Sequence, residues 1–211
     1  MKKLFIDTSS SHITLAIVDD NCILSYIDEI NDVMLSERIF PLITKLFEDA
    51  KLNIKNISKI YVVNGPGSFT GVRIGVTIAK TVAWTLKLPV IPISSLEVIA
   101  STSCDGDYLI PYIDARRGYV FAGVYDSELK IIQEDSHTKL STLISKLPKK
   151  AKCILVGYDE INSVLNKIKP SIDIIKVIAK HQDDLGITPH ELIPNYLKLT
   201  EAEENLKKVN V

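Results

Sequence analysis

Three residues with oxygen-bearing side chains follow the first apolar run of the chain. Asp7, Thr8 and Ser9 come directly after residues 4–6. In many phosphotransferases an Asp and small hydroxyl residues at such a place hold a metal-bound nucleotide phosphate. The same residue types are also common in ordinary turns. The three side chains are therefore candidate contacts for a nucleotide or phosphate, with a plain turn as the alternative.

The segment GPGSFTGVRIG, residues 65–75, is the most distinctive run in the sequence. Its glycines allow tight turns, and the start of a following helix would offer unpaired N–H groups to an anion. The segment lacks the Gly-Lys-Ser/Thr ending of a P-loop, and its glycine spacing does not fit a dinucleotide fingerprint. We therefore favour a structural role, in which the glycines let a strand and a helix pack closely.

Two adjacent arginines, Arg116 and Arg117, lie in a short connection between two expected strands. Guanidinium groups at such a place could reach a phosphate, an RNA or the carboxylates of a partner. A solvated, charged turn is the alternative, because exposed arginines are common in turns.

The remaining histidines and cysteines give little support for catalysis. The four histidines show neither HxxxH nor HExxH spacing, and the sequence has no GxSxG motif. The cysteines Cys22, Cys104 and Cys153 are far apart and form no CxxC pair, so we expect reduced thiols. We therefore predict no catalytic residue and no metal site.

Apolar periodicity predicts the elements that position these residues. Strands are expected over residues 4–6, 13–18, 23–30, 57–63 and 90–93, then over 108–113, 119–125, 129–132 and 153–156. Shorter helices are expected from residue 95, over 140–147 and over 160–168. A polar break near residues 103–107 predicts an N-terminal lobe over 1–103 and a smaller C-terminal lobe over 104–211.

Two longer helices are expected over residues 35–50 and 72–86. The first has an apolar stripe wider than one packed face needs, and the second is apolar around most of its circumference. Exposed apolar surface of this kind marks a partner interface. The residues expected at that interface are Leu35, Ile39, Phe40, Ile43, Phe47, Arg73, Thr77, Lys80 and Trp84.

The composition is that of a globular protein: 46% of the 211 residues are hydrophobic and 24% are charged. Lys+Arg at 25 and Asp+Glu at 26 leave a formal net charge of -1. A protein that held nucleic acid alone would usually be basic, so another chain should hold most of any RNA substrate. Neither a signal-peptide core nor an apolar run of membrane-spanning length occurs, and we expect a cytoplasmic protein without membrane association.

Six segments in order along nearly the whole chain resemble the TsaB (YeaZ) family of tRNA threonylcarbamoyladenosine biosynthesis proteins, which are paralogues of the catalytic subunit TsaD. The segments are FIDTSS, LSERIFPLI, GPGSFTGVRIG, PVIPISSLE, IDARRGYV and PNYLKLTEAE. Leu35 stands where the family often has His, and Lys198 where it commonly has Arg.

The resemblance implies an α/β protein of the actin/Hsp70/sugar-kinase (ASKHA) fold, with two related lobes of mixed sheets flanked by helices. It implies a non-catalytic scaffold or activating subunit in the transfer of threonylcarbamoyl to the tRNA adenosine beside the anticodon (t6A formation). The implied partners are a TsaD-like catalytic subunit, a TsaE-like ATPase, tRNA indirectly through the complex, and a second copy when the chain is alone. No cofactor is expected, and ATP or ADP is a candidate only at the heterodimer interface.

Three other functions stay open at this point, and one of them is a purely structural homodimer. An active ATP-dependent phosphotransferase of the sugar-kinase type would use Asp7 and the region around Asp114, but it would need a second glycine-rich phosphate loop. A peptidase would need a nucleophile or a metal pair. The sequence offers neither an identifiable nucleophile nor a metal-binding pair.

Overall fold

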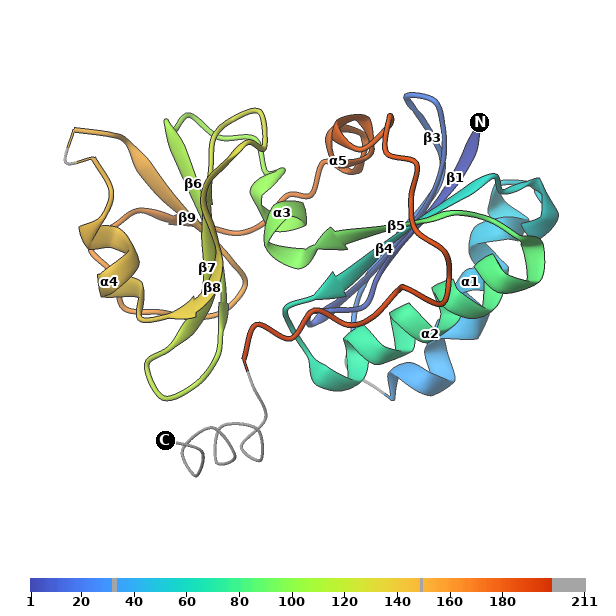
Figure 1. Cartoon of the computed structure of the whole chain (residues 1–211), viewed down its shortest axis with the longest axis horizontal. Coiled ribbons are helices and arrows are strands. Elements are labelled where there is room, and N and C mark those ends of the chain that lie inside the picture. Colours follow the sequence, from blue (N-terminus) through green and yellow to red (C-terminus); the bar gives the residue numbers. More distant parts are fainter. Residues whose placement is uncertain (32–33, 149, 199–211) are drawn as a thin grey trace.

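The computed structural model describes residues 1–31, 34–148 and 150–198. Two five-stranded mixed sheets lie side by side with helices between them, and further helices cover their outer faces (Figure 1). The predicted fold class, mixed sheets flanked by helices, is confirmed.

The first sheet has the strand order β3-β2-β1-β4-β5. β1 (Lys2–Asp7), β2 (His12–Asp19) and β3 (Cys22–Ile30) are antiparallel neighbours. β4 (Lys59–Gly65) and β5 (Val90–Ser94) extend the other side of β1 in parallel. Parallel neighbours need a crossover, and a helix supplies the one between β4 and β5.

The second sheet repeats this pattern, with the order β10-β9-β6-β7-β8. β6 (Tyr108–Asp114), β7 (Val120–Tyr125) and β8 (Ile131–Thr138) form the antiparallel part. β9 (Cys153–Val156) and β10 (Lys167–Ile168) add in parallel on the other side of β6. The same order of antiparallel and parallel pairings in both sheets shows that the two lobes are related.

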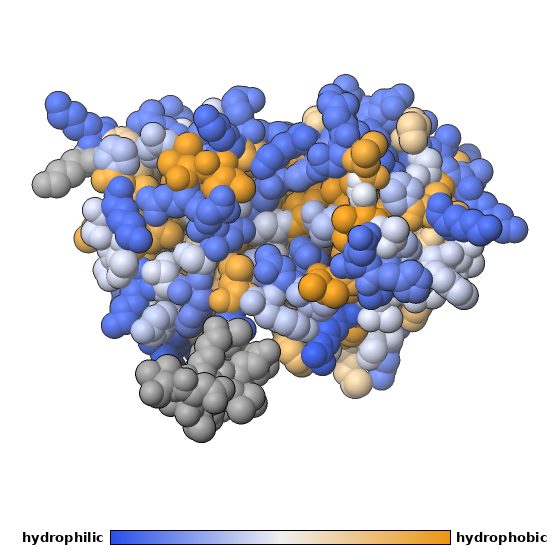
Figure 2. Space-filling view, in the orientation of Figure 1, coloured by the Kyte–Doolittle hydropathy of each residue, from blue (hydrophilic) through white to orange (hydrophobic). Residues whose placement is uncertain are grey.

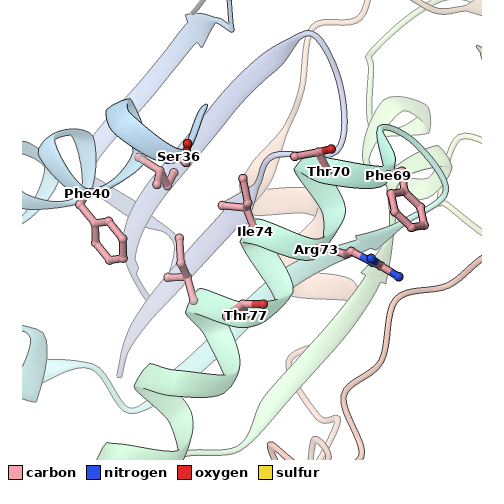
Figure 3. Close-up of a pocket in the computed structure, with 9 residues that line it drawn as sticks. Ser36, Phe40, Phe69, Thr70, Arg73, Ile74 and Thr77 are labelled. Atoms are coloured by element: carbon pink, nitrogen blue, oxygen red, sulfur yellow. The ribbon is translucent and has the colours of Figure 1, made fainter. Parts of the chain in front are cut away.

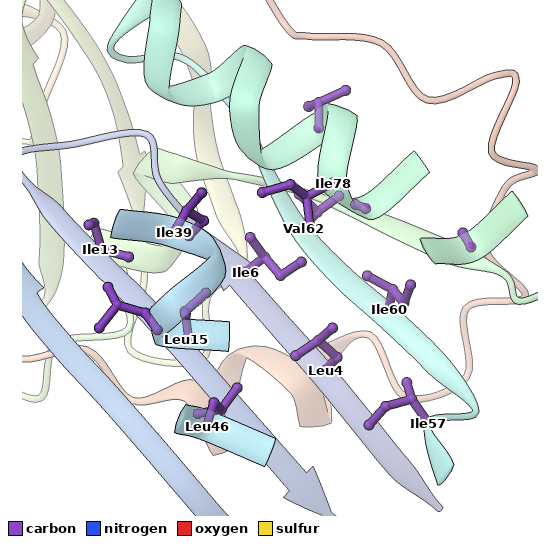
Figure 4. Close-up of a cluster of buried hydrophobic side chains, with 14 of the residues drawn as sticks. Leu4, Ile6, Ile13, Leu15, Ile39, Leu46, Ile57, Ile60, Val62 and Ile78 are labelled. Atoms are coloured by element: carbon purple, nitrogen blue, oxygen red, sulfur yellow. The ribbon is translucent and has the colours of Figure 1, made fainter. Parts of the chain in front are cut away.

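The outer face of the first sheet is covered by α1 (Leu35–Asp49) and α2 (Phe69–Leu86). Branched aliphatic side chains from both helices and from the strands beneath them form one buried cluster (Figure 4). Ser68 caps α2, since its Oγ accepts a hydrogen bond from the Gly71 N–H at 3.2 Å. A short 3-10 helix, Ile54–Asn56, leads into β4.

The space between the sheets is filled by α3 (Ser95–Ala100) and α5 (Ile174–Lys180) (Figure 1). Their apolar side chains join a second buried cluster with Phe5 and Tyr61 of the first sheet and Tyr125 of the second. The outer face of the second sheet carries α4 (Leu140–Ser145).

After α5 the chain returns to the first sheet. Residues 182–198, here called the strap, run along α2 (Figure 1). Ile187 bridges to Val90, and Leu192 is fully buried in the cluster under α2. Asn195 N–H donates to the Asn64 carbonyl at 2.7 Å. The predicted division near residue 103 assigns this segment to the second lobe, whereas it packs on the first sheet.

Two sequence predictions in the second lobe are wrong. The helix expected over residues 160–168 is an irregular segment that ends in β10. Ile161 and Leu165 pack against the core of the lobe, but Val164 is 95% exposed, so the apolar spacing that resembles a helix face does not form one buried side. The strand expected over residues 129–132 begins at Ile131 and continues to Thr138.

Candidate partner-binding surface

The interface residues predicted on α1 differ in how far they are buried. Leu35, Ile39 and Phe47 are 6%, 1% and 8% exposed, because they belong to the core that joins α1 to the first sheet. Their assignment to an exposed interface is therefore wrong for the isolated chain. Ile43 is half-buried against the same core. Phe40 is 63% exposed and points away from the sheet.

A groove of about 430 Å³ runs between α1 and α2 (Figure 3). Its lining is mostly apolar, with Phe40 at one side and Phe69 at the other. Thr77 is exposed and lines the groove, next to Ile74 and one turn from Arg73. The groove places exposed aromatic rings beside half-buried aliphatic side chains, as the anchor sites of protein interfaces do.

Arg73 does not extend freely from α2. Its guanidinium carbon lies 3.8 Å from the ring centroid of Phe69, and its Nε donates to the Tyr196 hydroxyl at 2.8 Å. Phe69 and Tyr196 also stack, with ring centroids 5.5 Å apart. The sequence prediction missed both aromatic residues, although Phe69 lies in the distinctive glycine-containing segment.

Lys80 and Trp84 lie further along α2. The Lys80 Nζ donates to the Leu192 carbonyl of the strap at 3.0 Å, so this predicted interface cation is used within the chain. Trp84 is 67% exposed and lines a hollow of about 240 Å³ with Pro189 and His190 of the strap. On the face in Figure 2, apolar side chains form small groups among polar ones.

The polar side chains of the loop between β1 and β2 form hydrogen bonds within the loop and to α2. The Asp7 Oδ1 accepts hydrogen bonds from the Ser9 N–H at 2.8 Å and the Ser9 hydroxyl at 2.7 Å. Thr8 donates its hydroxyl to the Gly71 carbonyl at 2.7 Å. Burial raises the pKa of the Asp7 carboxyl, against the opposing effect of the bonds from Ser9. All three side chains are buried, and these bonds anchor the loop to α2.

The glycines of the distinctive segment pack against this loop. A Cβ added at Gly71 would lie 2.0 Å from the Thr8 carbonyl oxygen, and one added at Gly67 would lie 2.2 Å from the Ser9 carbonyl oxygen. No side chain larger than hydrogen fits at such distances without movement of the backbone. The predicted structural role of the glycines is confirmed.

A second hollow, of about 320 Å³, opens between the lobes beside Ser9, Ser68 and Tyr158. Among the described residues, the charged ones that line it are Asp114 and Asp159. His12 stacks on Tyr158 with ring centroids 4.5 Å apart. Without a bound cation, these two carboxylates would repel an anionic phosphate.

A buried ionic cluster that the sequence prediction missed joins α3 to the end of α5. Glu97, 6% exposed, accepts hydrogen bonds from Lys180 Nζ at 2.8 Å and from His181 Nε2 at 2.6 Å. The bond to Glu97 raises the pKa of His181. Burial would raise the pKa of Glu97, but the bonds from His181 and Lys180 outweigh it and lower that pKa. The spacing of apolar residues along a helix does not indicate which charged side chains will meet in a buried cluster, so the sequence could not predict this one.

Arg116 and Arg117 lie in the second lobe, in the turn between β6 and β7, away from α1 and α2 (Figure 1). Both are exposed. The structure therefore brings the α1 and α2 residues together, and Asp7 to Ser9 together with the glycine segment. The two arginines follow Asp114, which lines the hollow beside Ser9 and Ser68, but neither arginine is among its described lining residues.

Three general features complete the description. Within residues 1–31, 34–148 and 150–198, no group of three or more His, Cys, Asp or Glu side chains is placed to hold a metal ion. Cys22, Cys104 and Cys153 are free thiols, as predicted. Among the described helices, none combines the length and the apolar character that crossing a membrane requires.

Comparison with known proteins places the chain among relatives. The family model TsaD, tRNA N6-adenosine threonylcarbamoyltransferase, matches residues 29–189. A Bacillus subtilis protein named tRNA threonylcarbamoyladenosine biosynthesis protein TsaB is 34% identical over 96% of each chain. A Buchnera aphidicola protein of the same name is 30% identical over 73% of this chain and 77% of its own. A Pseudomonas aeruginosa crystal structure, described as an uncharacterized protein with similarity to peptidase YEAZ, superposes with a TM-score of 0.81 at 21% identity, covering 93% of this chain and 99% of that one.

Proposed function

The chain belongs to the TsaB family of tRNA threonylcarbamoyladenosine biosynthesis proteins, with the ASKHA fold, and on that premise we propose that it is a non-catalytic subunit of the assembly that makes t6A. It scaffolds and activates a TsaD-like paralogue, which performs the transfer of threonylcarbamoyl to the tRNA adenosine. A TsaE-like ATPase joins the assembly, and tRNA is held mainly by the other subunits. The proposed compartment is the cytoplasm.

The observation that carries this proposal is the groove between α1 and α2, lined by Phe40 and Phe69, together with the separate hollow lined by Trp84 further along α2. Phe40, Phe69 and Trp84 are 63%, 53% and 67% exposed. None of the three belongs to the buried cluster under the helices, and although Phe69 stacks with Arg73 and Tyr196, much of each ring stays in water. A related chain would carry an equivalent pair of helices, and two such pairs would pack as a four-helix contact.

The polar residues at the start of the chain support an accessory role. Asp7, Thr8 and Ser9 form hydrogen bonds within the loop and to α2, so these groups are already used inside the protein. An ATP-dependent phosphotransferase would need these groups to face a metal-bound phosphate. A nucleotide, if one takes part, belongs to the interface with the TsaD-like subunit.

The same surface offers a second arrangement in the absence of the partner. Two copies of this chain could bring their α1 and α2 helices together, since an isologous contact uses one patch twice. The TsaD-like subunit would then displace the second copy.

The test is depletion of this protein followed by mass spectrometry of tRNA nucleosides, with copurification of the tagged chain and a TsaD-like protein. We expect t6A to fall and to return on re-expression, and the two proteins to copurify. The purified chain should show no steady-state ATPase, kinase or peptidase turnover. Unchanged t6A on depletion, or ATP hydrolysis that disappears in Asp7→Ala, would contradict the proposal.

A further inference from the structure

The turn between β6 and β7 has an unusual backbone. Arg116, Arg117 and Gly118 follow one another with φ values of 65°, 55° and 77°. The left-handed region costs a residue with a side chain roughly 1–2 kcal/mol, and glycine could relieve that cost at both arginine positions. Asp114 fixes the turn, because its Oδ1 accepts a hydrogen bond from the Arg116 N–H at 2.9 Å. Backbone strain kept at exposed residues is typical of positions whose side chains have a role.

The two guanidinium groups have no partner among residues 1–31, 34–148 and 150–198. No hydrogen bond or ion pair joins either side chain to another described residue, and both are exposed. The other two arginines of the chain behave differently: Arg38 pairs with Glu29, and Arg73 is held by Phe69 and Tyr196. The turn therefore presents two permanent positive charges to the solvent.

An aromatic surface adjoins these charges. Tyr119 follows the turn, is 36% exposed, and stacks on His137 of β8 with ring centroids 4.9 Å apart and an interplanar angle of 16°. The Lys139 Nζ lies 5.7 Å from the centroid of the Tyr119 ring. Three cationic side chains and a partly exposed, stacked aromatic ring thus gather at one end of the second sheet.

We propose that Arg116, Arg117, Tyr119 and Lys139, here called the RNA patch, bind a single-stranded segment of the tRNA substrate. The guanidinium and ammonium groups contact phosphates, and an unstacked base packs on the Tyr119 ring. An acidic protein surface would use the cations alone, whereas RNA also uses an aromatic ring beside them. This inference rests on the proposed function, because that function supplies the RNA.

The position of the RNA patch agrees with this use. It lies on the second lobe, while α1 and α2 lie on the outer face of the first sheet (Figure 1). A partner on α1 and α2 would leave the patch open, so the chain could bind the catalytic subunit and extend its RNA-binding surface together. The formal net charge of -1 agrees with a patch that adds to affinity provided mainly by another subunit.

The test is fluorescence anisotropy of the assembly with its TsaD-like partner, titrated onto a labelled tRNA transcript at several salt concentrations. The variant is R116A/R117A, in which the Cβ atoms and therefore the backbone strain are retained. The matched control is K130A/K150A, which removes two exposed lysines from the opposite end of the same sheet. Tyr119→Leu removes the aromatic ring but keeps an apolar side chain, whereas Tyr119→Phe keeps the ring, so the two variants separate stacking from apolar bulk.

We expect R116A/R117A to weaken binding at least tenfold and to lower the slope of log affinity against log salt by about 1.4, the value for two contacts to a single strand. Tyr119→Leu should weaken binding several-fold with the slope unchanged, and Tyr119→Phe should bind normally. An effect of R116A/R117A no larger than that of K130A/K150A would overturn the proposal. So would loss of copurification of R116A/R117A with the TsaD-like partner, since the arginines would then serve the protein partner. Failure of the proposed function would appear separately, as absent copurification of the unaltered chain.

Discussion

Ile39 and Phe40 are neighbours on α1 but face different surroundings. Ile39 is 1% exposed, part of the core and only at the floor of the groove, whereas Phe40 is 63% exposed at its side. Replacing each with Ala therefore separates folding from partner binding within one turn of one helix.

The structure sets the size of both effects. Truncation of a buried Ile to Ala costs about 2–5 kcal/mol of unfolding free energy. In a chain of this length each kcal/mol lowers the melting temperature by about 2–4 °C, so Ile39→Ala should lose about 4–20 °C. Phe40→Ala should cost less than about 0.5 kcal/mol, because most of its ring is already in water. An aromatic anchor at the centre of an interface contributes about 2 kcal/mol or more, which is roughly a 30-fold change in Kd.

Thermal unfolding followed by circular dichroism measures the first effect, and calorimetric titration with the TsaD-like partner measures the second. Val164→Ala is the control for an exposed apolar residue, since Val164 is 95% exposed in the other lobe. It should change neither quantity. If Phe40→Ala unfolds as easily as Ile39→Ala, or binds the partner as tightly as the unaltered chain, the assignment of the groove as the interface is wrong.

Three further predictions concern the fold. Gly71→Ala should lower the free energy of unfolding by about 1–3 kcal/mol, because the new Cβ would lie 2.0 Å from the Thr8 carbonyl oxygen. This loss is expected although alanine has a better helix propensity than glycine. Equal or higher thermal stability would contradict the packing argument. His181→Gln should destabilise the chain most between about pH 4.5 and 6.5. Because the pKa of His181 is raised in the folded state, its contribution to stability is complete below pH 6.5 and is lost as the pH rises through the folded-state pKa. Because the pKa of Glu97 is lowered, its contribution is present above pH 4.5 and is lost as the pH falls. A difference in melting temperature that does not depend on pH would refute this. Arg117→Gly should be about 1 kcal/mol more stable than Arg117→Ala in denaturant titration, because φ is 55° at this position, and equal midpoints would show that the turn is unstrained.

The sequence predicts the first lobe better than the second for a physical reason. β1, β2 and β4 are continuous apolar runs, and α1 and α2 carry long apolar stripes, so periodicity places them within a few residues. In the second lobe, α5 has seven residues and β10 has two, which is too short for a pattern to be distinguished from chance.

Periodicity also could not separate the core side of α1 from its exposed side. Ile39, Phe40 and Phe47 all widen the apolar stripe, and only the position of the sheet shows that Phe40 is the exposed one. The strap is unpredictable in the same way. Its contacts with Arg73 and Lys80 join residues more than 100 positions apart, and no local pattern encodes them.

The strap also affects the order in which the protein can be completed during synthesis. Asn64 Nδ2 bonds to the Ile193 carbonyl, 129 residues further along the chain, and Leu192 fills a place in the core of the first lobe. At roughly 5–20 residues per second, the ribosome needs on the order of 6–26 s to make that stretch. During this time the first lobe has an unfilled apolar site beside α2, where a chaperone or a protease could act. A released chain that ends ahead of Leu192 should therefore be degraded faster than one that ends after Lys198.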